Sequence, residues 1–151
     1  MKLPVERSNV FIQKKFKNEE EYFDYMSNFL EKHDLVTNEY RKAILDREES
    51  FPTGLEIGDI NIAIPHTDYI YSKTNTICVT TLENAVKFKR MDDSSKSVNV
   101  KIILQLLFDK PDKQVTLLKE LMAKVTDQNF LQKLVKEKNE ENIVKLFNNV
   151  D

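Results

Sequence analysis

Glycine is scarce in this sequence, with two residues among 151. Phosphate-binding loops and dinucleotide fingerprints each need several glycines at fixed spacing, so this scarcity excludes both kinds of nucleotide site. Cysteine occurs once, at Cys78, and no disulfide can form within these 151 residues. Because Cys78 lies in the apolar run 76–80, we expect it to be buried as a small hydrophobic residue, not exposed as a reactive thiol.

An excess of charge of one sign is also absent. The 23 basic and 25 acidic residues give a formal net charge of −2, whereas nucleic-acid-binding proteins usually carry a strongly basic face. A nucleic-acid partner is therefore not expected. The two histidines and the single cysteine lie far apart in the chain. They provide no cluster of ligands at zinc spacing, so we expect neither a metal nor another cofactor.

Long hydrophobic runs are missing as well. No segment approaches the roughly 20 consecutive apolar residues of a membrane-spanning helix. Residues 1–7, MKLPVER, lack the apolar stretch of a secretory signal peptide. These absences predict a soluble, cytoplasmic protein. Hydrophobic residues still make up 40% of the chain, which is enough for the core of one domain of ordinary size.

The chain does contain an alternation of apolar strands and amphipathic helices. In the helical segments apolar residues recur every three or four positions, and in the others they form short β-branched runs. The nearly continuous apolar run 100–108 is typical of a strand covered by helices on both faces. A single α/β domain over residues 1–151 accounts for this order. The predicted strands are 9–12, 61–64, 76–82, a separate 85–89 after a turn at Glu83 and Asn84, and 98–108; the predicted helices are 19–32, 37–49, 109–125, 129–136 and 140–147.

Capping residues place the ends of these helices. Thr37 or Asn38 is expected to cap the second helix, and Asp109 the third, with Pro111 in its first turn. His33 stands at the end of the first helix, where the helix dipole favours a cation, so a capping role is expected for it. The third helix is expected to bury a stripe made of Val115, Leu117, Leu118, Leu121, Met122 and Val125.

The segment 61–68, NIAIPHTD, points most directly to chemistry. Its apolar strand stops at Pro65, and the next residue, His66, is one of two histidines in the chain. The ends of strands are where α/β folds tend to bind ligands. An imidazole there can act as a nucleophile, a base or a ligand. The residues alone leave open whether His66 does so or simply ends a strand.

Five sequence blocks occur in a fixed order along the chain. They are REE at 47–49, FPTGL at 51–55, IAIPHTD at 62–68, VKII at 100–103 and QVTLLKELM at 114–122. Together they resemble the fructose/mannitol-type enzyme IIA of the bacterial phosphotransferase system, and within that family the galactitol-type branch. The resemblance covers residues 10–147. It implies a mixed β-sheet flanked by helices on both faces.

The resemblance also implies a phosphoryl relay with named partners. In this family the carrier HPr passes a phosphoryl group to the IIA histidine, which hands it to a cysteine of IIB. IIB then phosphorylates the sugar that enters through the membrane component IIC. Carried onto this sequence, the phosphorylated residue is His66 and the arginine of the motif is Arg47. Phosphoryl transfer depends on positioning and charge neutralisation, and a guanidinium binds phosphate oxygens bidentately, so both residue types suit these roles.

Three further residues are candidates for supporting the site. Thr53 and Thr67 lie in the PTGL and PHTD blocks, where each could supply a hydroxyl donor to a phosphoryl group. Asp68 follows Thr67 directly. It either orients His66 or caps the turn that comes next, and the sequence does not separate these two roles.

One position departs from the family pattern. Mannitol-type members carry a second active-site histidine at the start of the helix that follows the long strand. Aligning Gln114 and Val115 puts Asp112 at that position. A carboxylate there would repel a phosphohistidine, although it could also hydrogen-bond His66 and fix its tautomer, as in hydrolytic triads. The simpler interpretation is that Asp112 occupies the first turn of a helix, where acidic residues are favoured.

Two functions of different classes fit these residues. The first is a IIA component that accepts phosphate from HPr on His66 and delivers it to IIB, for galactitol or a related polyol or sugar. The second is a regulatory module whose phosphorylation at His66 controls a partner protein, as in the nitrogen-regulatory relatives. An inactive relative is disfavoured because both His66 and Arg47 are present. For transient docking we expect a shallow apolar rim around His66, including Ile64, Tyr69 or Tyr71.

Overall fold

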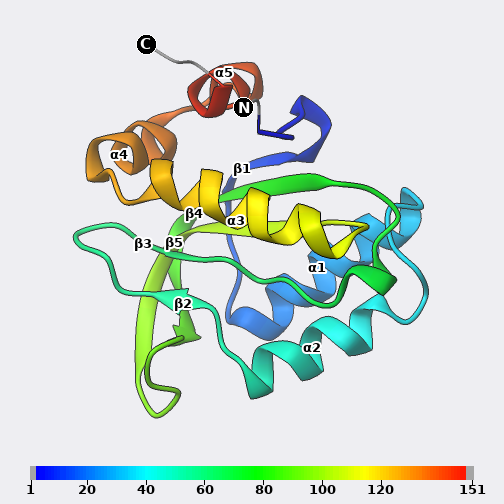
Figure 1. Ribbon diagram of the computed structural model, residues 1–151. Helices are drawn as coiled ribbons and strands as arrows, with labels where there is room; N and C mark the ends of the chain where they lie inside the picture. Colours follow the sequence, from blue (N-terminus) through cyan, green and yellow to red (C-terminus); the bar gives the residue numbers. More distant parts are fainter. Residues whose placement is uncertain (1–2, 149–151) are drawn as a thin grey trace.

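The apolar segment expected to be a strand covered by helices on both faces is β5 (Ser97–Leu107), which lies in the middle of a five-stranded mixed sheet (Figure 1). The computed structural model describes residues 3–148. The strand order is β1-β4-β5-β3-β2. The pairs β1–β4 and β3–β5 are parallel, whereas β4–β5 and β2–β3 are antiparallel. The other strands are β1 (Val10–Lys14), β2 (Gly54–Leu55), β3 (Asn61–Ala63) and β4 (Thr76–Lys89).

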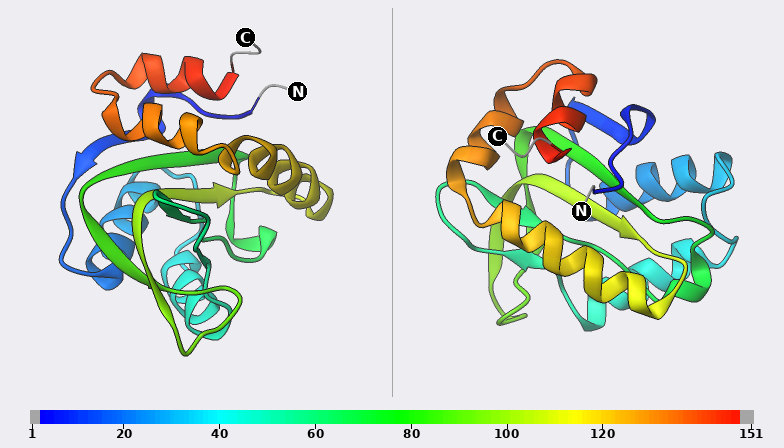
Figure 2. Two further views of the ribbon diagram at one scale, coloured as in Figure 1. Left: turned by 90° about the vertical axis from the view of Figure 1, so that its left-hand side faces the viewer. Right: turned by 45° about the horizontal axis from the view of Figure 1, so that its top comes forward.

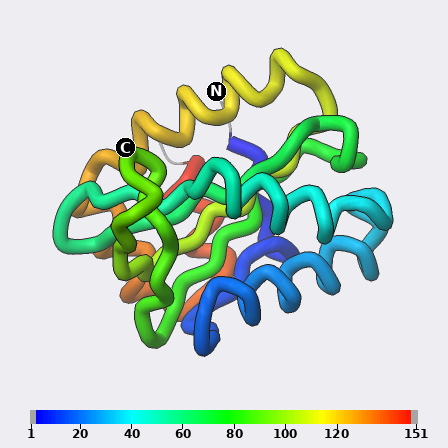
Figure 3. Tube along the Cα trace, turned by 90° about the horizontal axis from the view of Figure 1, so that it is seen from below, coloured from blue at the N-terminus to red at the C-terminus, as the bar shows by residue number. Residues whose placement is uncertain are grey.

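Helices cover both faces of this sheet, as expected. One face is covered by α1 (Glu19–Lys32) and α2 (Tyr40–Ser50), which lie side by side when the molecule is seen from below (Figure 3). The other face is covered by α3 (Pro111–Val125), α4 (Gln128–Lys136) and α5 (Glu140–Asn148) (Figure 2). Each layer closes its own hydrophobic core against β4 and β5. No helix within residues 3–148 is long and apolar enough to cross a membrane.

Local sequence signals placed several elements correctly. Helix α1 has the predicted bounds, and the side chain of Asn18 caps it by accepting a hydrogen bond from the Glu21 N–H at 2.9 Å. His33 ends this helix, with its Nδ1 2.9 Å from the carbonyl oxygen of Phe29, which confirms the capping role. Cys78 is fully buried, and burial raises the pKa of its thiol to about 12. It therefore behaves as a small core residue.

The prediction of a separate strand at 85–89 was wrong. Strand β4 runs without interruption from Thr76 to Lys89 and stays paired with β5, with a register shift between Thr81 and Val86. The polar residues that suggested a turn lie within this irregularity, where a β-bulge accommodates extra residues. The ammonium group of Lys101 on β5 donates to the carbonyl oxygen of Glu83 at 2.9 Å and helps to satisfy the irregular backbone there.

The predicted caps of α2 and α3 were also wrong. Helix α2 begins at Tyr40 after Glu39, without a side-chain cap. Thr37 instead acts through its backbone, because its N–H donates to the Tyr71 carbonyl and its own carbonyl accepts from the Tyr40 N–H. Helix α3 begins at Pro111, after Lys110. Asp109 precedes both, and its N–H donates to the side chain of Asn75 at 3.0 Å.

Val115 does not belong to the buried stripe of α3. Its side chain is 69% exposed, whereas Leu117, Leu121 and Val125, four residues apart, are buried. Two positions along an α-helix correspond to a rotation of about 200°, so Val115 and Leu117 point to nearly opposite sides. Leu118 and Met122 are partly buried against the same core.

Strand β2 is the element that the sequence did not predict. It has two residues and pairs antiparallel with β3, with Gly54 opposite Ala63. A Cβ at Gly54 would lie 2.6 Å from the Lys89 carbonyl oxygen and 2.9 Å from Cγ1 of Val98. The absence of a side chain therefore allows this short strand to lie close to the end of β4. The pairing of β2 with β3 ties the segment after α2 to this edge of the sheet.

Candidate functional site

His66 lies at an edge of the sheet where two parallel strands end together. It comes three residues after β3, whose parallel neighbour β5 leads into α3. The hydrogen-bonded ladder continues beyond β3, because the Leu106 N–H donates to the Pro65 carbonyl at 3.0 Å. The imidazole is 7% exposed, and its ring centroid lies 6.1 Å from that of Phe108. This edge is the one at which the sequence placed the chemistry.

One hydrogen bond sets the tautomer of His66. Its Nδ1 lies 2.8 Å from the carbonyl oxygen of Ile64. A carbonyl oxygen can only accept, so Nδ1 carries the proton and Nε2 keeps a free lone pair. Burial lowers the pKa of His66 below its usual value of 6.5; the bond to Ile64 opposes this effect, and the charge of Arg47 adds to it. At neutral pH the side chain is a neutral imidazole with a nucleophilic Nε2.

Arg47 stands in the last turn of α2, beside this imidazole. It lines two hollows together with His66. Its guanidinium carbon lies 4.7 Å from the centroid of the Phe51 ring. Among residues 3–148, Arg47 takes part in no ion pair. The structure therefore brings together the histidine and the arginine that the sequence singled out, and it leaves the positive charge available to an anion.

The polar hollow beside His66 has a volume of about 260 Å³. Thr67, which is 8% exposed, lies in its wall. Asp68 also lines it, but its carboxylate accepts from the Ile70 N–H at 3.5 Å and so caps the short 3-10 helix Tyr69–Tyr71. Asp68 was expected either to orient His66 or to cap the following turn. Within residues 3–148 it forms the cap and makes no hydrogen bond to His66. The complete lining is Arg47, His66, Thr67, Asp68, Tyr69, Pro111 and Gln114.

Asp112 is not a wall residue of either hollow around His66. It is exposed in the first turn of α3, as the simpler interpretation held. From this turn Pro111 and Gln114 line the polar hollow. Asp112 is therefore not in the observed wall beside His66, where the alignment would have put it. Gln114, a neutral hydrogen-bonding side chain, faces the same hollow as the imidazole.

A second hollow, apolar and of about 430 Å³, is also lined by His66 and Arg47. Phe51 is 62% exposed and Met91 46% exposed. The predicted rim was only partly right: Ile64 lines this hollow but is buried, Tyr69 lines the polar one, and Tyr71 packs against the core beneath α1 and α2. The guanidinium of Arg47 and the imidazole of His66 belong to residues that line both hollows. The complete lining is Arg47, Phe51, Pro52, Thr53, Leu55, Ile64, His66, Met91, Leu118 and Met122.

Thr53 does not supply a hydroxyl proton to these hollows. It is 2% exposed; its Oγ1 donates to Oε1 of Glu48 at 2.8 Å, and its N–H donates to Oε2 at 2.9 Å. Burial raises the pKa of Glu48 to about 7, while the two bonds from Thr53 act in the opposite direction. Sequence reasoning missed Glu48. The signal was its spacing, because Tyr40, Ile44 and Glu48 recur every four residues on the inward face of α2.

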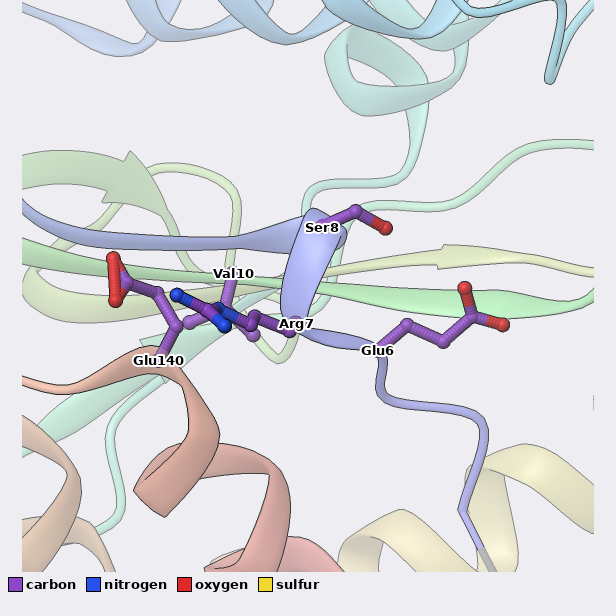
Figure 4. A pocket seen from close by; sticks show the side chains of 5 residues that line it. All are labelled: Glu6, Arg7, Ser8, Val10 and Glu140. Atoms are coloured by element: carbon purple, nitrogen blue, oxygen red, sulfur yellow. The ribbon is translucent and has the colours of Figure 1, made fainter.

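A larger hollow at the start of the chain lacks comparable chemistry. It lies between the segment before β1 and the start of α5 (Figure 4). Its lining consists of Glu6, Arg7, Ser8, Val10 and Glu140. In Figure 4 the carboxylate of Glu6 points away from the guanidinium of Arg7, which extends toward Glu140. The lining includes no imidazole or thiol. Within residues 3–148 no group of three or more His, Cys, Asp or Glu side chains could hold a metal ion.

Comparisons with known proteins identify the family and the fold of this chain. Residues 4–150 match the family described as "Phosphoenolpyruvate-dependent sugar phosphotransferase system, EIIA 2". The galactitol-specific EIIA component of the PTS system from Escherichia coli K12 is 28% identical over 130 residues, which cover 85% of this chain and 86% of that protein.

Two solved structures share the fold. The nitrogen regulatory protein IIA-Ntr from Neisseria meningitidis has a TM-score of 0.80 at 19% identity, with 95% of each chain covered. The Escherichia coli complex of enzyme IIA for mannitol with phosphorylated enzyme IIB has a TM-score of 0.74 at 21% identity. That match covers 92% of this chain and 93% of the other.

Proposed function

Because the chain belongs to the EIIA 2 family of the phosphoenolpyruvate-dependent sugar phosphotransferase system, and is thus a phosphoryl-carrying component of that system, we propose that His66 is the residue that carries the phosphoryl group. The observation that supports this most strongly is the hydrogen bond from Nδ1 of His66 to the Ile64 carbonyl. It leaves Nε2 unprotonated beside the guanidinium of Arg47, which has no ion-pair partner within residues 3–148.

The chemistry on His66 runs in two steps. Nε2 attacks the phosphorus of phospho-HPr; the new N–P bond forms as the bond to the donor breaks, and Nδ1 keeps its proton on the Ile64 carbonyl. The phosphorylated ring then carries a positive charge. This charge makes the imidazole a good leaving group when the phosphoryl group is passed on. A cysteine thiolate of IIB attacks the phosphorus next, and the N–P bond breaks to return the neutral imidazole. Arg47 neutralises the phosphoryl oxygens in both steps, which is the main demand of phosphoryl transfer.

Phosphorylation of the wild-type protein tests this proposal. Incubation with phosphoenolpyruvate, enzyme I and HPr should add one phosphoryl group, and 15N NMR of the labelled imidazole should place it on Nε2. Because the pKa of His66 is lowered, the rate of phosphoryl uptake should stay constant from alkaline pH down to about 6.5. Below that pH the rate should decline, because Nε2 becomes protonated. No incorporation, or phosphate on Nδ1, would contradict the proposal.

The apolar hollow and its rim form the docking surface for HPr and for IIB in turn. Exposed apolar side chains around a polar centre favour transient association. Phe51 and Met91 provide the largest exposed apolar area of this rim. The 28% identical relative is named galactitol-specific, so the cognate IIB is that of galactitol or a related polyol, and IIC takes part only through IIB. Retention of the phosphoryl group in the presence of such a IIB would instead favour the regulatory alternative.

Replacing Met91 with alanine should weaken docking without affecting chemistry. We expect KM for phospho-HPr to rise about tenfold with kcat unchanged, because truncating an exposed rim side chain removes contact area but leaves His66 and Arg47 in place. The measurement is steady-state transfer at varied phospho-HPr, with urea unfolding to check stability. Val144→Ala, on α5, is a control expected to leave KM unchanged. If the Met91→Ala protein loses several kcal/mol of stability, Met91 is a core residue and not a docking contact.

A further inference from the structure

The buried carboxyl group of Glu48 has no part in the phosphoryl chemistry described above. Glu48 is 4% exposed and lies on the inner face of α2. Both oxygens of its carboxyl group accept hydrogen bonds from Thr53. Burying a carboxyl group is costly unless its hydrogen bonds are satisfied. Thr53 supplies two donors from one residue, and it lies in the wall of the hollow that also contains His66.

Hydrogen bonds continue from this pair to the imidazole. The carbonyl oxygen of Thr53 accepts from the Ile64 N–H at 3.2 Å. The carbonyl oxygen of Ile64 then accepts from Nδ1 of His66 at 2.8 Å. Glu48, Thr53, Ile64 and His66 are thus connected by successive hydrogen bonds, although 18 positions of sequence separate the first from the last.

We propose that Glu48 and Thr53 form a latch that holds Arg47 and His66 at the separation needed for phosphoryl transfer. The inference rests on the proposed function of His66. Arg47 precedes Glu48 in the last turn of α2, and its side chain faces the hollow while that of Glu48 faces the core. The two bonds between Glu48 and Thr53 tie this turn to the segment just before β2. The Thr53 carbonyl in turn accepts from Ile64, whose own carbonyl sets the tautomer of His66. Glu48 and Thr53 are positioning residues and do not touch the phosphoryl group.

The latch addresses a specific geometric problem. Arg47 is carried by a helix and His66 by the segment that follows a strand, and residues 51–60 connect the two elements along the chain. A misplacement of about 1 Å between reacting groups can reduce a rate a hundredfold. The pairing of β2 with β3 and the burial of Tyr40 and Ile44 hold α2 on the sheet. The two side-chain bonds to Glu48 add a restraint at its last turn, next to Arg47.

Thr53→Val tests the latch, because valine keeps the shape of threonine and removes only the hydroxyl donor. We expect kcat for phosphoryl transfer from phospho-HPr to fall about tenfold to a hundredfold. KM should stay unchanged, because the exposed rim is intact. Thr53→Ser restores the hydroxyl and should recover most of kcat. Glu48→Gln should also keep a substantial rate, since its amide can accept from the Thr53 N–H and donate to the Thr53 hydroxyl.

Thr81→Val is the matched control for a lost buried hydroxyl. Thr81 is 1% exposed, and its Oγ1 accepts from the Gln13 N–H at 2.9 Å, away from His66. A similar loss of stability in urea is expected in the two valine variants, with a lower kcat only for Thr53→Val. The second readout is 15N NMR of His66, in which Thr53→Val should reduce the fraction of the tautomer with the proton on Nδ1. A role limited to folding stability would not change that fraction.

Three outcomes would overturn the latch. They are a kcat of Thr53→Val within about twofold of wild type, an unchanged tautomer fraction, or a Thr53→Ser protein as slow as Thr53→Val. The proposed function fails separately, if the wild-type protein takes up no phosphoryl group on His66. The tautomer measurement needs no phosphoryl donor, so it tests the coupling of Thr53 to His66 even in that case.

Discussion

Replacing His66 with alanine should abolish phosphoryl uptake from phospho-HPr. Within residues 3–148 the chain has one other histidine, His33, whose Nδ1 is bound to the Phe29 carbonyl at the end of α1. The single thiol, Cys78, is fully buried with a raised pKa, so it cannot replace the imidazole as a nucleophile. No label should therefore appear on the His66→Ala protein under conditions in which the wild type takes up one phosphoryl group.

The control for this experiment is the folded state of the variant. His66 is 7% exposed and packs near Phe108, so alanine leaves a small gap at the sheet edge. We expect a loss of stability of about 1–2 kcal/mol in urea unfolding, with retained secondary structure. His33→Ala should label fully, because His33 lines neither of the two hollows beside His66 and its Nδ1 is bound to the Phe29 carbonyl. Label that survives in a folded His66→Ala protein would show that another residue carries the phosphoryl group.

The second large effect is expected at Arg47. Arg47→Ala should reduce kcat for phosphoryl transfer about a hundredfold to a thousandfold, as is typical when one preorganised charge-stabilising group is removed. The free energy of unfolding should change little, because Arg47 is exposed and forms no ion pair within residues 3–148. Single-turnover transfer from phospho-HPr measures the chemical step directly.

Arg47→Lys distinguishes charge from geometry. An ammonium group keeps the positive charge but cannot bind two phosphoryl oxygens with a planar fork. We therefore expect an intermediate rate, above that of Arg47→Ala and well below that of wild type. Lysine also loses the packing of the guanidinium over Phe51, which holds the side chain near the hollow. Equal rates for Arg47→Lys and wild type would show that only the charge matters; equal rates for Arg47→Ala and wild type would remove Arg47 from the mechanism.

The elements that local patterns placed well are those whose signals are complete within a few residues. Helix α1 has an N-cap, Asn18, a regular apolar face and a histidine at its end, and its bounds were predicted correctly. Strand β4 was divided in two because the polar residues Glu83 and Asn84 look like a turn. The pairing with β5 overrides that local signal, since a bulge keeps both halves of β4 in one strand.

The supporting residues of the site were predicted less well. Aligning Gln114 and Val115 with the family offered Asp112 as a residue beside His66, but Gln114 lines the hollow and Asp112 is exposed, as the simpler interpretation held. Thr53 was expected to face a ligand, and it binds Glu48 instead. Both outcomes depend on long-range packing, of α3 in the first case and of α2 and the segment after it in the second, which a short motif does not specify.

The sequence by itself determined the order of the helices and of the strands other than β2, apart from the division of β4, and the two covered faces of the sheet. It also identified His66 and Arg47 as the residues to consider. Periodicity and short motifs are local, so one chain is enough to read them. The tertiary structure alone decided that these two side chains share the same hollows, that Nε2 of His66 is the free nitrogen, and that Glu48 lies beneath them. The physical reason is that these relations depend on long-range pairing: β3 with β5, β2 with β3, and α2 against the sheet.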